Sequence, residues 1–245
     1  MSLKFMVPDL SDKRILYASN YLKTAGYETS EKIEQCQFIL LGVNPKNIHR
    51  VNDSRLPVFA GNVSGESIYD YTKSETFAID NAYLTAEGAV ALATENSDQS
   101  LIHSSVLITG YGRIGKALQK YLSVYTRDIT VCARNPHQRA VAQNNNCDVI
   151  DFNELNNCTQ YDFIFNTVPH PVFNAKELST VREDALLMDL ASFPGGVDVH
   201  LTDFYGIHFL TARGLPSKYS PKSAGYIVGR TVDEMIQNHP DLIRR

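Results

Sequence analysis

The sequence lacks an excess of basic residues. Lys and Arg together number 23, Asp and Glu number 27, and the formal net charge is −4 at pH 7. Proteins that bind duplex nucleic acid or an anionic membrane need clustered positive charge, so we expect neither partner. The sequence also lacks an apolar run of the roughly 18 residues that span a bilayer. Pro8 and Asp9 interrupt the first apolar stretch, and we predict a soluble cytoplasmic protein without a signal peptide.

Cysteines are few and scattered. Cys36, Cys132, Cys147 and Cys158 form no CxxC pair, whereas a structural zinc site requires closely spaced Cys or His ligands. We therefore predict no metal site. Cys132 lies in a predicted buried strand with no base beside it, so reduced, packed thiols are a better interpretation than a catalytic cysteine.

The 245 residues, of which 43% are hydrophobic and 20% charged, are enough for two modest globular domains. Short apolar runs alternate with longer amphipathic stretches, a pattern typical of βα units and a parallel sheet. After residue 103 the pattern predicts the strands of a complete doubly wound Rossmann fold. Those strands are 106–109, 128–133, 148–152, 162–168, 185–191 and 207–212.

Residues 1–84 give a smaller α/β domain by the same reasoning. We predict strands at 4–7, 38–43, 57–60 and 77–79, and a helix across 13–25. An alanine-rich stretch after Thr85 predicts an interdomain helix within residues 85–102. Residues 103–245 then form the dinucleotide-binding domain, and its last helix, 222–237, is expected to pack back across an interdomain cleft.

The strongest local motif is a GxGxxG turn that follows an apolar run and opens a helix. In this context the glycines permit a tight turn, let backbone N–H groups approach a pyrophosphate and allow close packing of helix on strand. The alternative is a glycine turn whose phosphate site is empty. The candidate cofactor residues of the turn are Gly110, Tyr111, Gly112, Arg113, Ile114 and Gly115.

The residues about 20 positions after the glycine turn should determine which cofactor is bound. NAD-preferring domains end the second strand with an Asp or Glu that accepts the ribose hydroxyls, but this chain has Arg134 and Asn135 there. Arginine cannot accept those bonds, whereas it can pair with a 2′-phosphate. We therefore expect NADP, with NAD as the alternative. Arg139 either reinforces Arg134 or, more simply, is a solvated surface cation.

Three later loops should line the nicotinamide side. Thr167, Val168 and Pro169 are candidates to seat the nicotinamide, and His170 exchanges protons near neutral pH. The loop after Asp189 contains Ser192 and two adjacent glycines that let backbone approach a ligand. The loop from Arg213 to Gly225 carries three cations and a helix start, which favours an anion. For any single one of these residues a surface or capping role is the simpler alternative.

At these residues the sequence resembles the A subunit of dipicolinate synthase, a family related in fold to the NAD-binding domains of D-2-hydroxyacid dehydrogenases. One departure from the family pattern is Phe193, because the position after Ser192 is often basic. The loop pair 189–198 and 214–225 is more specific than the dinucleotide turn. The matching stretches are residues 81–88, 110–115, 166–169, 189–198, 214–216 and 221–225.

The resemblance implies a sporulation enzyme that oxidises the product of 4-hydroxy-tetrahydrodipicolinate synthase to dipicolinate with NADP or NAD, beside a flavoprotein-like B subunit. A small anionic dicarboxylate would then be held by Arg213, Lys222 and the Ser192 loop. Either Glu87 or His170 would take the proton, and Lys222 is a candidate for catalysis as well as for binding. We also expect a homo-oligomer.

Two other function classes remain open. A D-2-hydroxyacid-type dehydrogenase needs an Arg, a carboxylate and a His from the later loops; Arg213 and His170 are present, but no obvious Glu–His relay follows them. A non-catalytic NADP-responsive regulatory protein would bind the cofactor without turning over any imine or keto acid.

Overall fold

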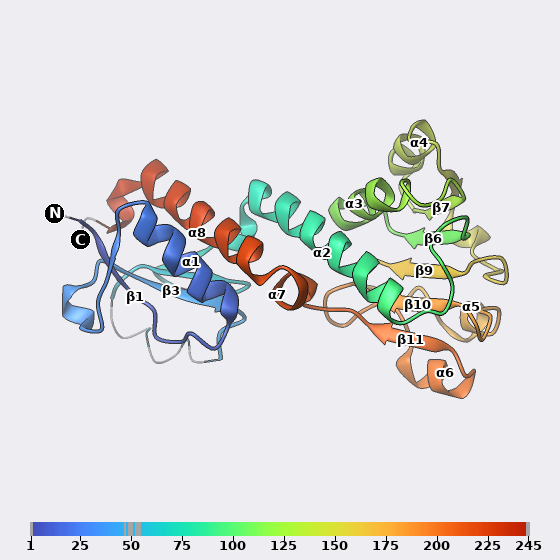
Figure 1. The fold of residues 1–245 in the computed structure, drawn as a ribbon, viewed down its shortest axis with the longest axis horizontal. Coiled ribbons are helices and arrows are strands. Elements are labelled where there is room, and N and C mark those ends of the chain that lie inside the picture. Colours follow the sequence, from blue (N-terminus) through green and yellow to red (C-terminus); the bar gives the residue numbers. More distant parts are fainter. Residues whose placement is uncertain (1, 47, 49–50, 52–54, 244–245) are drawn as a thin grey trace. The chain divides into compact units, whose positions relative to one another are not determined.

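The structure is a computed structural model that describes residues 2–46, 48, 51 and 55–243. It divides into two compact units (Figure 1): Met1–Leu84 with Pro216–Arg245, and Thr85–Leu215. Each unit holds a parallel sheet with helices packed on it. The fold class expected from the sequence, a doubly wound Rossmann sheet with a smaller α/β domain before it, is confirmed.

The first unit contains a sheet of strand order β2-β1-β3-β4-β5, with all its neighbouring strands parallel. Its helix α1 begins where the Asp12 carboxylate accepts a hydrogen bond from the Arg14 N–H, 2.9 Å away. Gly26, at φ +100°, follows the end of that helix. The elements are β1 (Lys4–Met6), α1 (Lys13–Thr24), β2 (Glu28–Thr29), η1 (Ile33–Gln35), β3 (Phe38–Val43), β4 (Val58–Gly61), β5 (Ile68–Asp70), η4 (Tyr71–Lys73), α8 (Pro221–Asn238) and η6 (Pro240–Ile243).

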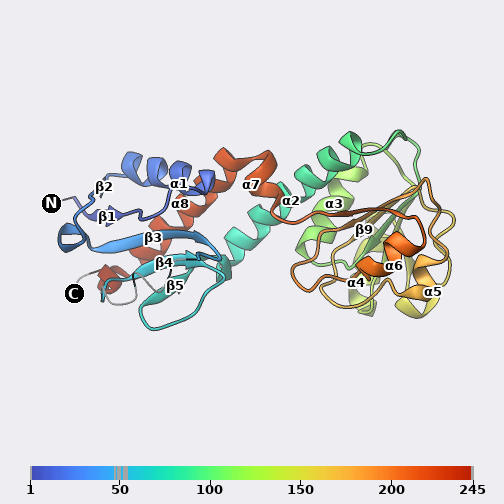
Figure 2. The ribbon, with the colours of Figure 1, turned by 90° about the horizontal axis from the view of Figure 1, so that it is seen from below.

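Helices α1 and α8 lie side by side on this sheet (Figure 2). Two glycines of α8 allow the close approach. A Cβ atom at Gly225 would overlap the Arg14 carbonyl oxygen and lie 2.6 Å from the Tyr17 Cβ, and one at Gly229 would lie 2.8 Å from the Tyr21 Cβ. Val228, Val232 and Ile236 of α8 then join the core that contains Phe5 and Phe38.

This packing changes the domain division that the sequence suggested. We expected residues 103–245 to form one domain, but the structure places the C-terminal helix with the N-terminal sheet. The physical reason is the glycine face of α8, which fits closely against α1. The interdomain helix also differs, because α2 (Glu75–Glu95) begins ten residues before Thr85 and includes residues 77–79, which we had predicted as a strand. A short apolar run does not by itself distinguish a strand from a buried helical turn.

The second unit contains, in its described residues, a six-stranded sheet of order β11-β10-β9-β6-β7-β8. All neighbouring strands are parallel, so their carboxyl ends share one edge. The chain order reverses between β6 and β9, the switch point at which doubly wound sheets bind ligands. The elements are β6 (Val106–Thr109), α3 (Arg113–Leu122), β7 (Ile129–Cys132), α4 (Pro136–Asn144), β8 (Asp148–Ile150), η5 (Phe152–Glu154), β9 (Phe163–Asn166), α5 (Ala175–Leu178), β10 (Leu186–Asp189), α6 (Val199–Phe204) and β11 (His208–Thr211). Helix α7 (Leu215–Tyr219) begins at the last residue of this unit, and its other residues belong to the first unit.

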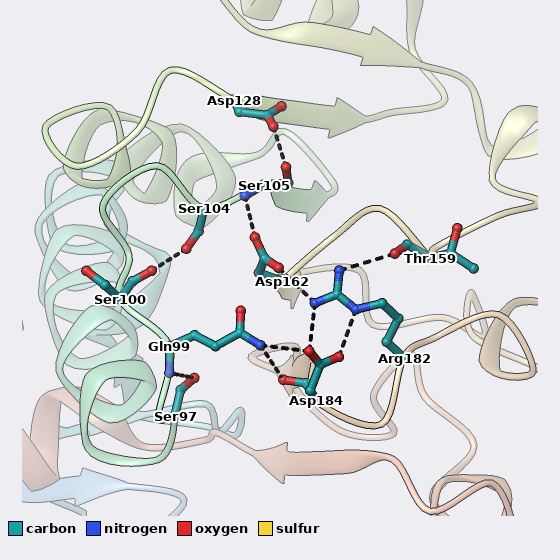
Figure 3. A network of polar contacts seen from close by, with 10 residues as sticks. All are labelled: Ser97, Gln99, Ser100, Ser104, Ser105, Asp128, Thr159, Asp162, Arg182 and Asp184. Carbon is teal, nitrogen blue, oxygen red and sulfur yellow. Dashed lines mark hydrogen bonds and ion pairs between the residues drawn. The ribbon is translucent and has the colours of Figure 1, made fainter.

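The amino-terminal edge of this sheet is closed by a polar network around Arg182 (Figure 3). The Arg182 guanidinium donates to Asp162 at 2.9 Å and to Asp184 at 2.7 Å. Asp162 in turn accepts the N–H of Ser105 at 2.8 Å, immediately before β6, and Gln99 donates to Asp184 at 3.2 Å. The network therefore joins the segment after α2 to the starts of β6, β9 and β10, at the edge opposite to the strand ends that carry the candidate site.

Candidate functional site

The glycine turn between β6 and α3 is built around three different steric requirements. Gly110 adopts φ +86°, and a Cβ atom there would lie 2.5 Å from the Thr167 Oγ1. A Cβ at Gly115 would overlap the Gly110 carbonyl oxygen, so this glycine permits close packing of helix on strand. At Gly112, by contrast, an added Cβ would meet no atom of the described chain within 4 Å.

Gly112 therefore leaves open space in front of the first turn of α3. The first N–H groups of a helix have no partner within the helix and favour an anion such as a pyrophosphate. The geometry of the turn thus fits a dinucleotide: Gly110 and Gly115 pack closely within the protein, and the space beside Gly112 is left free for a ligand. Arg113, at the first position of α3, is exposed, and Ile114 is half-buried.

The side chain of Tyr111 does not face this space. It is buried, with its hydroxyl 3.3 Å from both the Gln119 Oε1 and the Asn145 Nδ2, between α3 and the end of α4. Burial raises the pKa of the Tyr111 phenol. Only the Tyr111 backbone is available to a cofactor, and the side chain fixes α3 against α4.

The polar residues after β7 have different environments. Arg134 is exposed, whereas Asn135 caps α4 by accepting the His137 N–H at 2.9 Å. Arg139 donates to the Ala133 carbonyl at 2.6 Å and pairs with Asp151 at 2.7 Å. Arg139 is thus part of the local structure, and Arg134 is the cation whose charge is directed to solvent.

A buried polar network links the ends of β6, β9 and β10. Thr109, Asn166 and Asp189 are each the last residue of their strand and at most 2% exposed. Thr109 Oγ1 donates to the Asn166 side-chain oxygen at 2.7 Å, and Asn166 Nδ2 donates to Asp189 at 2.8 Å. Asn166 Oδ1 also accepts the Val168 N–H at 3.1 Å. The network therefore fixes the loop after β9 relative to the glycine turn.

Thr167, Val168 and Pro169 follow this network directly. Thr167 Oγ1 donates to the carbonyl of Thr109 at 2.8 Å, next to Gly110. Val168 is half-buried, and Pro169 and His170 are exposed. The structure thus places the expected nicotinamide residues beside the glycine turn.

The buried Asp189 carboxylate fixes the loop after β10 through hydrogen bonds to its backbone. The buried carboxylate accepts N–H groups of Ala191 at 3.2 Å and of Gly196 at 3.1 Å. A Cβ at Gly195 would overlap the Asp189 carboxylate, and one at Gly196 would overlap the Asn166 amide. The sequence predicts that these glycines let the backbone approach a ligand, whereas in the structure they let the loop pack closely on Asp189 and Asn166. Ser192 remains exposed at the end of the strand.

Arg213, which follows β11, also stabilises this loop by hydrogen bonds to its backbone carbonyls. Its Nε donates to the Ala191 carbonyl and its Nη2 to the Pro194 carbonyl, both at 3.0 Å. Nη2 also lies 3.9 Å from the Asp189 carboxylate. Arg213 is thus first a structural residue of this loop, and neither of the two hydrogen bonds uses its Nη1 group.

The remaining candidates are divided between the units. Glu87 is exposed on α2 in the second unit, and Lys222 is exposed near the start of α8 in the first. The structure therefore brings together the glycine turn, Thr167, Val168, Ser192 and Arg213 at the edge of one sheet. The joint binding of a carboxylate by Arg213 and Lys222 stays a prediction.

Sequence reasoning did not name Thr109 as a site residue, and it treated Asn166 and Asp189 only as the first residues of two candidate loops, not as members of a buried network. The signal was present, because each is a polar residue that ends an otherwise apolar strand. No group of three His, Cys, Asp or Glu side chains among the described residues is placed to hold a metal ion. Within that same part of the chain no helix is both long and apolar enough to cross a membrane.

Comparisons with known proteins agree with this geometry. Residues 79–192 match the family model of the D-isomer specific 2-hydroxyacid dehydrogenase NAD binding domain. The A subunit of dipicolinate synthase from Bacillus subtilis is 30% identical over 163 residues, which are 66% of this chain and 55% of that protein. The matched segment thus spans little more than half of that relative.

Two solved structures have the same fold. The A chain of dipicolinate synthase from Bacillus subtilis superposes with a TM-score of 0.83 at 23% identity, over 98% of both chains. The A subunit of dipicolinate synthase from Bacillus halodurans superposes with a TM-score of 0.84 at 20% identity, over 96% of this chain and 97% of the other.

Proposed function

The chain belongs to the family of the dipicolinate synthase A subunit, and on that premise we propose that it is a nicotinamide-dependent oxidoreductase. The observation that carries the proposal is the open backbone at Gly112, held between two internally packed glycines at the switch point of the sheet. The match of residues 79–192 to an NAD-binding domain supports it. The proposed reaction is the oxidation of a dihydrodipicolinate-type cyclic imine to dipicolinate, with a role in sporulation.

The residues of the site suit such a reaction. The N–H groups at the start of α3 would hold the pyrophosphate, and Thr167, Val168 and Pro169 would border the nicotinamide. When bound, this cofactor accepts a hydride. The Asp189 network holds the Ser192 loop and Arg213 in place before a substrate arrives, which lowers the entropic cost of binding a carboxylate.

The proposed reaction removes one water molecule, one hydride and one proton from the substrate, and the hydride passes to the oxidised nicotinamide. The 4-hydroxylated tetrahydro ring loses water, then a hydride and a ring proton, and becomes an aromatic pyridine. We propose His170 or Glu87 as the proton acceptor, because both are exposed side chains of the same unit and can exchange protons with solvent. The Arg213 Nη1 group and Lys222 would bind the substrate carboxylates.

For the cofactor we propose NADP rather than NAD. Arg134 supports this choice, because its exposed guanidinium follows β7 at the position where an NAD-preferring domain has an acidic residue. Arg139 does not contribute, since its guanidinium pairs with Asp151 and the Ala133 carbonyl.

A coupled assay tests the function. Pyruvate, aspartate semialdehyde and the preceding synthase are incubated with this protein and NADP⁺ or NAD⁺, each with and without a flavoprotein-like B subunit, the proposed partner. We expect reduced nicotinamide and dipicolinate to form together. Nicotinamide binding without either product in any combination would contradict the enzyme function and favour a regulatory protein.

The match to the 2-hydroxyacid dehydrogenase domain favours one second candidate, reduction of a 2-keto acid. A parallel assay with pyruvate and NADH or NADPH, without the synthase, distinguishes it, because a 2-keto acid reductase would then oxidise the reduced nucleotide. Light scattering over a range of protein concentrations tests the proposed homo-oligomer in the same samples.

A further inference from the structure

Phe193 presents a large aromatic ring to solvent at the edge of the candidate site. The side chain is 84% exposed, although it follows closely on the buried end of β10 and directly on the exposed Ser192. An exposed phenylalanine retains an unfavourable apolar surface in water, and a ligand that covers it gains that free energy. The ring is therefore available for contact with a bound molecule.

The guanidinium of Arg213 lies beside this ring. Its Cζ is 5.9 Å from the ring centroid of Phe193, within the range of a cation–π interaction. The Nε and Nη2 groups are held by the carbonyls of Ala191 and Pro194, which leaves the Nη1 side of the planar fork out of these bonds. An aromatic face and a fixed cationic donor thus lie next to each other.

The buried network fixes the loop backbone that carries Phe193 and the carbonyls that hold Arg213. Asp189 accepts the Gly196 N–H at the end of the loop and the Ala191 N–H at its start. Gly195 and Gly196 fit closely over Asp189 and Asn166. Because the loop is fixed at both ends, little backbone ordering is needed before the ring and the guanidinium contact a ligand.

We propose that Phe193 and Arg213 form a binding surface for a planar conjugated ring that carries a carboxylate, and that Phe193 determines specificity for a flat ring over a puckered one. This inference rests on the proposed function, in which a puckered tetrahydro ring becomes a planar pyridine. A flat ring stacks on the phenyl face with all its atoms, whereas a saturated ring touches it with few. The carboxylate pairs with the arginine fork.

Calorimetric titration of the full chain tests the proposal with two probes, pyridine-2,6-dicarboxylate and its saturated analogue cis-piperidine-2,6-dicarboxylate, with and without NADPH. We expect the wild type to bind the planar probe about five- to tenfold more tightly than the saturated one. Phe193→Ala should lose this preference, and Phe193→Tyr should keep it.

Phe204→Ala is the matched control. Phe204 is also exposed, at 77%, but it lies at the end of α6 beside Tyr205, and its removal should leave the preference unchanged. Equal affinity of the wild type for both probes, binding of neither probe, or a preference that survives in Phe193→Ala would each overturn the proposal. A thermal melt of each variant confirms that it is folded.

The outcome is separable from that of the proposed function. If the chain prefers the planar probe through Phe193 but forms no dipicolinate in the coupled assay, the proposed function fails and the binding surface stands. If dipicolinate forms but Phe193→Ala retains the preference, the function stands and the binding surface fails.

Discussion

Asp189 is the residue on which the geometry of the candidate site depends most. It is buried at the end of β10, and its two oxygens accept three hydrogen bonds, from the Asn166 amide and from the N–H groups of Ala191 and Gly196. Each donor would be left without an acceptor in the interior if the carboxylate were removed, which costs about 1–3 kcal/mol for a buried group.

Asp189→Asn tests this role. An amide offers one acceptor oxygen where the carboxylate offers two, so one set of donors would face an NH₂ group. We expect the free energy of unfolding, measured in urea, to fall by about 2 kcal/mol. Asp203→Asn, at an exposed position of α6, should change it by less than about 0.5 kcal/mol. Equal stability of the two variants would show that the network does not hold the loop.

Arg134 is the residue that should separate NADP from NAD. A charge-assisted bond to a 2′-phosphate contributes about 1.5–3 kcal/mol, so Arg134→Ala should weaken NADP⁺ binding at least about tenfold and leave NAD⁺ binding almost unchanged. Arg127→Ala is the control, because Arg127 is also exposed but precedes the first residue of β7, at the end of the strand away from Arg134. A parallel loss for both nucleotides in Arg134→Ala would contradict the assignment.

Among the helices, α8 is positioned by its glycines. Gly225→Ala would place a methyl group against the Arg14 carbonyl, the Tyr17 Cβ and the Ala18 N, all of which belong to α1. Since backbone atoms cannot move aside as a flexible side chain can, we expect a loss of about 1–3 kcal/mol in the free energy of unfolding. Ser223→Ala, at an exposed position of the same helix, should cost little. A fully stable Gly225→Ala protein would mean that the two helices are not in close contact.

The strands and the glycine turn of the second unit could be predicted from the sequence because their signals are local. An apolar run that ends in a polar residue or a glycine defines both the strand and the sheet edge that carries the site. The position of α8 could not be predicted, because the glycines that place it act on α1, which lies near the other end of the sequence. The roles of Gly195 and Gly196 were misjudged for the same reason, since their contacts are with Asp189 and Asn166.

At the level of the whole chain, the cysteines are distributed through both units and are all buried and free. Burial raises the pKa of the Cys132 thiol from about 9 to about 12, and those of Cys147 and Cys158 to about 11. The folded protein therefore keeps these thiols neutral at pH values at which the unfolded chain has already lost their protons.

The sign of the resulting pH dependence follows from proton linkage. The stabilisation is fully present below the unfolded thiol pKa, near 9, and is lost as the pH rises toward 11–12, because the folded state binds more protons in this window. At pH 10 each such thiol lowers the free energy of unfolding by about 1 kcal/mol. Urea titrations at pH 8 and pH 10 should show this fall, reduced by about 1 kcal/mol in Cys158→Ala. An unreduced fall in that variant would contradict the prediction.

The central claim is that a nicotinamide dinucleotide binds at the open glycine turn between β6 and α3. A fluorescence titration with NADPH, carried out on the wild type and on Gly112→Ala, tests it most directly. Gly112 has φ −81°, and the new methyl group meets no described atom within 4 Å. Because alanine is a poorer N-cap residue than glycine, we expect a folded variant that loses no more than about 1 kcal/mol of stability. We predict saturable binding by the wild type and about tenfold weaker binding by the variant, because the methyl group occupies the space of the pyrophosphate. Unchanged affinity in a folded Gly112→Ala protein, or no binding by the wild type, would contradict the account.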